Sequence, residues 1–242
     1  VVGLHLSSDL DTGLIGVMPG PVTASADAFA IIIEGKGGHG SQPESAVDPV
    51  VAAADLVMSV QTIVSRNIRP NNAAVVTVGT IHGGSNFNII APRVELTGTV
   101  RTFHAQDRAR IEARLKNLVD HIAEAYESHG TLHYQRGYPS VVNTLPEVEA
   151  VERIISRMWG ASAIRHPAPL MAGEDFAYYL ERIPGAFLML GCRNPAVGAI
   201  YPHHHPRFTL DEDALPIGVA LLAESALSFL TLGPASHEEA SS

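Results

Sequence analysis

Residues 27–35 read DAFAIIIEG, and this stretch decides the fold because it opens a regular series of strands and helices. Its run of three isoleucines, bounded by glycines, is typical of a β-strand. Asp48 and Pro49 follow as an N-cap and a first-turn proline. The apolar side chains after them recur at helical spacing, which predicts a helix that ends near Arg66.

The segment that follows this helix contains two more strands, a long helix and a last strand. Apolar alternation predicts the two strands, a glycine pair separates them, and the long helix has a continuous apolar stripe that stops near Gly130. The expected ranges are 73–82, 94–103, 106–128 and 131–135. The resulting order, β-α-β-β-α-β, predicts a ferredoxin-like unit with a four-stranded sheet and both helices on one face.

The sequence on either side of this unit predicts a larger α/β domain into which the unit is inserted. It contains an apolar opening strand, a buried strand near 186–190, and helices near 146–159, 174–180 and 216–230. Alternating helices and short apolar strands favour a largely parallel sheet. We therefore assign 1–22 and 136–242 to the larger domain and 23–135 to the inserted one.

Composition excludes several classes of protein. The 242 residues are 46% hydrophobic and 17% charged, which is ordinary globular composition. The net charge is −9 and the 16 Lys and Arg are scattered, so nucleic acid is not an expected partner. No apolar run reaches the ~18 residues of a membrane span. The single cysteine, Cys192, permits no internal disulfide and favours a reducing cytoplasm.

Two histidine-containing stretches are candidates for metal binding. His5 follows an apolar run and precedes a polar one, so it is expected at a strand end, where sites of open α/β sheets lie. A lone histidine there can also be structural. The tract of three histidines, 203–205, runs directly into Pro206 and is a compositional indication of metal binding.

Four other residues are candidates for catalysis or substrate binding. His39 lies in a glycine-rich loop, and an imidazole presented there is suited to stabilising an oxyanion. Arg101, 13 residues after Asn88, lies on a mostly apolar strand and needs an anionic partner, either a substrate carboxylate or a structural salt bridge. Glu174, with Asp175, lies at an expected helix start, where capping is as good an explanation as a functional role.

Eight motifs in a fixed order resemble the dinuclear metallo-amidohydrolase and metallopeptidase family that includes hippurate hydrolase, the indole-acetyl-amino-acid hydrolases, aminoacylases and carboxypeptidase G. The resemblance covers essentially the whole chain. The motifs lie at 3–6, 18–27, 35–40, 48–49, 88–92, 98–103, 173–176 and 204–208. The resemblance implies a metal-binding α/β domain with an inserted ferredoxin-like lid through which two chains form a homodimer.

The resemblance also implies roles for individual residues. His5 and His204 would each bind one of two divalent metal ions, which could be Zn, Mn, Co or Ni. His39 would reach across the dimer to the scissile carbonyl, and Asn88 with Arg101 would hold the substrate α-carboxylate. Glu174 would lie in the wall of the site.

The family's other metal ligands and its general-base glutamate have no counterpart in this sequence. We therefore expect the chain to be the C-terminal part of an enzyme that hydrolyses the amide bond of N-acyl amino acids, and to be inactive alone. The alternative is a non-catalytic, dimeric module that binds a small ligand or a protein, because ferredoxin-like units often serve that purpose.

Overall fold

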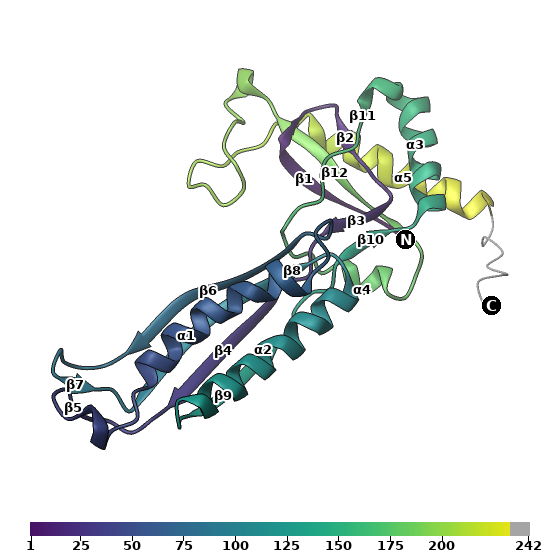
Figure 1. Cartoon of the computed structure of the whole chain (residues 1–242). Helices are drawn as coiled ribbons and strands as arrows, with labels where there is room; N and C mark the ends of the chain where they lie inside the picture. The colour runs from purple at the N-terminus through teal and green to yellow at the C-terminus, as the bar shows by residue number, and fades with distance from the viewer. Residues whose placement is uncertain (233–242) are drawn as a thin grey trace, which may run out of the picture. The chain divides into compact units, whose positions relative to one another are not determined.

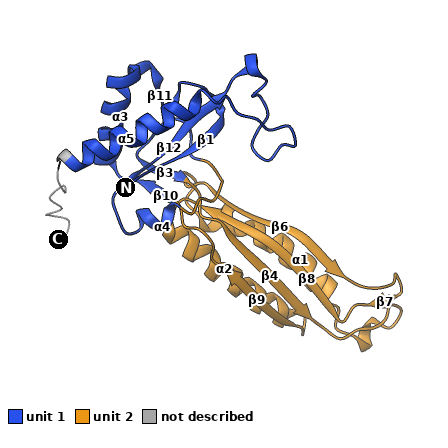
Figure 2. Cartoon of the chain, turned by 180° about the vertical axis from the view of Figure 1, so that it is seen from behind, with its two compact units in different colours: residues 1–22, 141–169, 176–242 blue, residues 23–140, 170–175 orange. Residues whose placement is uncertain are grey.

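The computed structural model describes residues 1–232, which form two compact units (Figure 2). Unit 1 consists of residues 1–22, 141–169 and those from 176 onward, and unit 2 of residues 23–140 and 170–175. The larger domain that we assigned to 136–242 extends over 233–242, which lie outside the described residues. No helix in residues 1–232 is long and apolar enough to span a membrane.

Unit 2 contains the six elements expected from the sequence, in the expected order. They are β4 (Asp27–Glu34), α1 (Pro49–Thr62), β6 (Ala74–Gly83), β8 (Arg93–Thr102), α2 (Ala105–Ala125) and β9 (His129–Gln135). The sheet order is β6-β8-β4-β9, with every neighbouring pair antiparallel. This is the ferredoxin-like arrangement. The first helix stops at Thr62 and continues as a π-helical turn, Ile63–Asn67, which the sequence pattern did not reveal.

Both helices cover the same face of this sheet (Figure 1). β4 alternates, so Phe29, Ile31 and Ile33 are buried beneath the helices while Ala28 and Ala30 point to the other face. We call that uncovered side the open face. Apolar side chains from both helices complete the core, among them Ala52, Leu56, Val60, Ile111, Leu115 and Val119.

A buried carboxylate fastens one end of unit 2, which we call the base. Asp27 begins β4 and forms an ion pair with Arg108 of α2; these side chains are 0% and 12% exposed. Arg108 Nε donates to it at 2.9 Å, the Tyr134 hydroxyl at 2.7 Å and the Gly137 N–H at 3.0 Å. Burial alone would raise the pKa of the Asp27 carboxyl, but these hydrogen bonds and the Arg108 charge hold it below its usual value.

Replacing Asp27 with Asn should lower the free energy of unfolding by about 3–5 kcal/mol at neutral pH, because Arg108 stays buried without its partner. Since the folded pKa is lowered, the ionised carboxylate stabilises the fold above about pH 4 and loses this effect as the pH falls through the folded value. Urea unfolding at a series of pH values measures both effects.

The control is Asp120→Asn, because Asp120 pairs with Lys116 on the exposed surface of α2. Its change should stay below about 1 kcal/mol. Equal stabilities of Asp27→Asn and the wild type at neutral pH would contradict the account.

Unit 1 is built on a smaller, mixed sheet. Its strands are β1 (Val2–Asp11), β2 (Ile15–Gly16), β11 (Ile164–Arg165) and β12 (Ala186–Arg193), in the order β1-β12-β2-β11. β1 is parallel to β12, but β2 is antiparallel to it. β2 and β11 are parallel, so two of the three pairings agree with the expected largely parallel sheet. The exception arises because the chain turns back through Gly13 at a positive φ and places the short β2 antiparallel beside β12.

Helices α3 (Leu145–Trp159) and α5 (Ala214–Leu232) pack on this sheet and share its core. β12 is buried over almost its whole length, as its continuous apolar sequence predicts. The helix expected at 174–180 is only the single turn α4 (Ala177–Leu180). Its acidic residues, Glu174 and Asp175, precede the helix instead of starting it.

Candidate functional site

His39 and Asn88 lie together at the end of unit 2 remote from the base. Two short strands, β5 (Gly38–His39) and β7 (Ile89–Ile90), pair there and set His39 opposite Ile89. The Gly40 N–H donates to the Asn88 carbonyl oxygen at 2.8 Å. A Cβ on Gly40 would lie 2.9 Å from that oxygen, so the loop needs glycine here. We call residues 38–41 and 86–90 the tip.

The neighbouring serine fixes the proton of the His39 imidazole. The backbone N–H of Ser41 donates to Nδ1 at 3.1 Å, and the Ser41 hydroxyl lies 2.8 Å from the same nitrogen. A backbone N–H can only donate, so Nδ1 accepts and the neutral ring carries its proton on Nε2. The ring is exposed, and its Nε2–H is therefore available to an oxygen atom of a ligand.

Long-range ¹H–¹⁵N correlation spectra should show His39 as the Nε2–H tautomer at about pH 8.5, where an ordinary imidazole is neutral. Ser41→Pro removes both donors and should give a mixture of tautomers. The exposed His121 on α2 is the control and should not change. A wild-type His39 with its proton on Nδ1 would contradict the assignment.

Arg101 lies at the base, on the open face of β8. It borders a cavity of about 290 Å³ whose other lining residues are Ala26, Asp27, Ala28, Thr99, Gln135, Gly137 and Tyr138. Among residues 1–232, no ion pair of Arg101 is found. The structural salt bridge is therefore absent from this part of the chain, and the guanidinium remains available to an anionic ligand.

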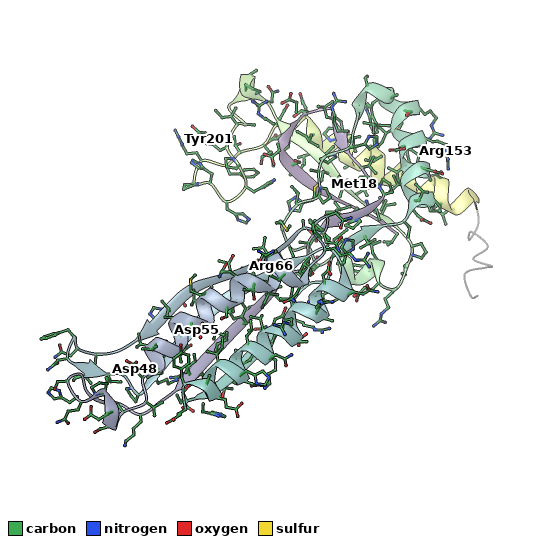
Figure 3. The ribbon with its side chains drawn as sticks, viewed as in Figure 1. Met18, Asp48, Asp55, Arg66, Arg153 and Tyr201 are labelled. Atoms are coloured by element: carbon green, nitrogen blue, oxygen red, sulfur yellow. The ribbon has the colours of Figure 1, made fainter. Side chains whose placement is uncertain are left out.

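The structure does not bring Asn88 and Arg101 together within one chain. Gly83 and Val94 form the last pair of the β6–β8 ladder before the tip, and Val75 faces Arg101 near the base. The seven residues from Val94 to Arg101 separate the two ends by about 24 Å of extended strand. Figure 3 shows the same separation along α1, where Asp48 lies toward the tip and Arg66 toward the base. A single small ligand cannot contact both side chains of one chain.

Glu174 belongs to the short segment of unit 2 that returns to the base. The preceding Gly173 lies against Ala26 and Tyr138, and a Cβ on it would be 2.6 Å from the Ala26 methyl group. Both of these neighbours also line the Arg101 cavity. The N-terminal cap residue of α4 is Phe176, two residues after Glu174.

In unit 1, His5 lies beside a histidine of the tract. Its ring centroid is 5.3 Å from that of His203, and both rings point to the Leu6 carbonyl oxygen, His5 through Nδ1 at 2.6 Å and His203 through Nε2 at 3.0 Å. A carbonyl only accepts, so both of these nitrogens carry protons. Nε2 of His5 then keeps a free lone pair, the state that a metal ligand needs.

The rest of the tract is held by stacking. The His205 ring lies parallel to Tyr201 (labelled in Figure 3) at 4.5 Å, and the Arg207 guanidinium lies 4.3 Å from the same ring. His204 is exposed at a φ of 65°, which is uncommon for a residue other than glycine. In residues 1–232 its ring has no hydrogen bond or ring contact, so it is the one imidazole of the tract left available.

These histidines fit a metal ion only in part. Imidazole nitrogen suits Zn, Mn, Co and Ni, and His5 has the right tautomer. Within the described range, however, no group of three His, Cys, Asp or Glu is placed to hold a metal ion. A catalytic site normally has three protein ligands and an open position, so residues 1–232 alone do not complete one.

Comparison with known proteins assigns the family. The model of peptidase family M20/M25/M40 matches residues 1–228. The chain belongs to this peptidase family. The chain is 38% identical over 232 residues to N-acetyl-L-cysteine deacetylase of Bacillus subtilis (strain 168), covering 95% of the chain and 54% of that protein. It is 36% identical over 222 residues to N-acetyldiaminopimelate deacetylase of Bacillus licheniformis, covering 92% and 58%.

A solved structure supports the same assignment to the M20 family. A Bacillus subtilis protein described as a dinuclear metal binding peptidase of that family superposes with a TM-score of 0.77 and 32% identity, over 93% of this chain and 56% of the other. The resemblance drawn from the eight motifs is thus confirmed at the level of family. The chain spans little more than half the length of these relatives. The family match begins at residue 1, so it lends no support to the expectation that family ligands precede Val1.

Sequence reasoning missed residues that act through their neighbours in this M20 chain. Ser41 follows the glycine-rich loop and fixes the His39 tautomer through its contacts with Nδ1. Nothing in the sequence around Ser41 indicates these contacts. His203 was given no role of its own, whereas it is the tract histidine that lies against His5. The strand alternation that places Arg101 could also have indicated Gln135, which lines the same cavity.

Proposed function

We propose that this chain forms part of a metal-dependent hydrolase that cleaves the amide bond of N-acyl amino acids. The observation that carries the proposal is Arg101, a cation without an ion pair in residues 1–232, at the edge of a cavity that fits a small carboxylate. The names of the deacetylase relatives support the substrate class. The His39 tautomer supports the reaction type, because an imidazole N–H can stabilise a carbonyl oxygen that gains negative charge.

In this proposal, different residues bind the two ends of the substrate. The fork of Arg101 binds the α-carboxylate, and Glu174 lies in the wall nearby. His39 donates its Nε2–H to the amide carbonyl oxygen, with Asn88 beside it. His5 and His204 would each hold one of two divalent ions, together with donors beyond residues 1–232. When bound, these ions polarise the carbonyl and lower the pKa of water.

The isolated 242-residue chain should show no metal-dependent turnover of N-acetyl or N-benzoyl amino acids, because its described residues supply too few metal donors. The assay adds excess Mn²⁺ or Zn²⁺ and measures the released amino acid. Turnover that needs metal and disappears in His5→Ala would show that the chain makes a complete site.

We also propose that residues 23–135 form a lid through which two chains dimerise. β6 is an edge strand of the sheet, and α1 packs beside it. The outer side of α1 exposes an apolar stripe of Val50, Val51, Ala54 and Met58, the last at 70% exposure. An open strand edge next to an apolar helix stripe suits a two-fold contact that extends the sheet. Such a dimer lets the tip of one chain reach the base of another.

Ala54→Asp should weaken this dimer by at least about tenfold in Kd, because the interface would bury an unpaired charge. Ala113→Asp is the matched control, since Ala113 is an exposed alanine of α2, away from the stripe. Analytical ultracentrifugation over a concentration series measures both. Equal effects of the two substitutions, or a monomeric wild type, would refute the proposed interface.

The alternative function is a non-catalytic dimeric module that binds a small carboxylate. The observation in its favour is that residues 1–232 bring together too few donors for a metal. An assay of the longest natural protein that contains this chain distinguishes the two functions. Metal-dependent hydrolysis there supports the enzyme, and ligand binding without turnover under every metal condition supports the module. For either, we propose the cytoplasm, since the single cysteine, Cys192, is buried and unpaired.

A further inference from the structure

A second, larger cavity adjoins the Arg101 cavity on the open face of unit 2. Its volume is about 680 Å³, and it lies over the middle of the sheet. The lining residues are Ala28, Phe29, Ala30, Thr97, Gly98, Leu132, His133, Tyr134 and Gln135. Ala28 and Gln135 line both cavities, so the two form one groove that starts at Arg101.

The strand register gives the groove its direction and length. Ala28 pairs with Thr99 on one side and with Gln135 on the other. Two residues further along β4, Ala30 pairs with Thr97 and with His133. The row that contains Ala30 is four residues from the row of Arg101, or about 13 Å along the strands. Alanines form the floor, and hydroxyl, amide and imidazole groups form the walls.

The groove offers a cation at its Arg101 end and an imidazole hydrogen-bond donor at its His133 end. Arg101 is cationic, and His133 is the other lining residue that can become cationic. The one carboxylate in the lining is Asp27, which already accepts from Arg108, Tyr134 and Gly137.

The next acid along the open face does not change this balance. Glu95 pairs with Ile32 in the row beyond Ala30, and its carboxylate forms an ion pair with Arg93. The groove can thus donate hydrogen bonds to anionic groups at two places without a facing acid.

We propose that this groove selects N-acyl derivatives of dicarboxylic amino acids. The α-carboxylate binds Arg101, and the side-chain carboxylate points along the floor to His133 and Gln135. After side-chain lengths are subtracted, the spacing fits a diacid of about five or six carbons. The inference rests on the proposed role of Arg101 and adds the side-chain specificity of the substrate.

The test uses the 242-residue chain and needs no metal, because it measures binding. ¹⁵N-labelled chain is titrated with N-acetyl-glutamate and with N-acetyl-glutamine, which have nearly the same size and differ in charge. N-acetyl-glutamate should bind about tenfold more tightly, as expected for one charge-assisted hydrogen bond. The largest shift changes should lie in β4, β8 and β9 on the open face.

Three variants and a control locate the effect. His133→Leu removes the imidazole donor, and Ala30→Leu fills the floor; each should reduce the preference for glutamate to about twofold or less while N-acetyl-glutamine still binds. Arg101→Gln should weaken both ligands. Lys116→Gln, on the exposed surface of α2 and outside the groove, should change neither.

The outcomes distinguish this inference from the proposed role of Arg101 on which it rests. Equal binding of both ligands, with both still weakened by Arg101→Gln, would overturn the groove and leave Arg101 as a carboxylate receptor. Binding that is absent, or unaffected by Arg101→Gln, would overturn both. Thermal unfolding of each variant identifies any loss of binding caused by loss of the fold.

Discussion

The set of hydrogen bonds to the buried Asp27 carboxylate is the interaction on which the base of unit 2 depends. It joins the start of β4 to α2 through Arg108, and to the end of β9 through Tyr134 and Gly137. A buried charge is tolerated only when its hydrogen bonds are satisfied, and here four donor groups of Arg108, Tyr134 and Gly137 satisfy it. Asp27 also lines the Arg101 cavity. The contact that joins these elements at the base therefore also forms part of the wall of the Arg101 cavity.

The length of the sheet is the second constraint, because it separates two kinds of chemistry. The tip offers the fixed Nε2–H of His39, and the base offers the cation of Arg101. β8 is an extended strand of ten residues, so its two ends are too far apart for both groups of one chain to contact one small molecule. A second chain removes this conflict, and the exposed stripe of α1 beside the edge strand β6 supplies a surface for it. The dimer proposed above would therefore be required by the proposed reaction.

Much of unit 2 could be predicted from sequence because its patterns are strong. The alternation of β4 and the apolar stripe of α2 each have one reasonable interpretation, and both are present as expected. Glu174 was harder, since acidic residues before a short helix resemble a cap when only their spacing is known. Asn88 and Arg101, 13 residues apart, were expected to act as one pair because the family resemblance implied it. An antiparallel hairpin makes that distance long, because the chain runs from the tip back to the base.

The remaining misses depend on backbone details that no pattern encodes. The positive φ of His204 and the hydrogen bond from His203 to Leu6 occur in the same loop as the stack of Tyr201 on His205. The two-residue strand β2 makes the sheet of unit 1 mixed, and a strand of that length leaves no periodic signal. Local stacking and short pairings were thus invisible, while long periodic elements were not.

The proposed composite site is tested most directly by mixing two variants, His39→Ala and Arg101→Ala, of the longest natural protein that contains this chain. Each alone should have its turnover lowered by ~10²-fold or more, because it lacks an oxyanion donor or a carboxylate receptor. If the tip of one chain serves the base of the other, a mixed dimer contains one complete site. An equilibrated equal mixture should then recover about a quarter of wild-type activity, since half of the dimers are mixed and one site in two is complete. No recovery in dimers shown to be mixed would mean that His39 acts within its own chain, or not at all.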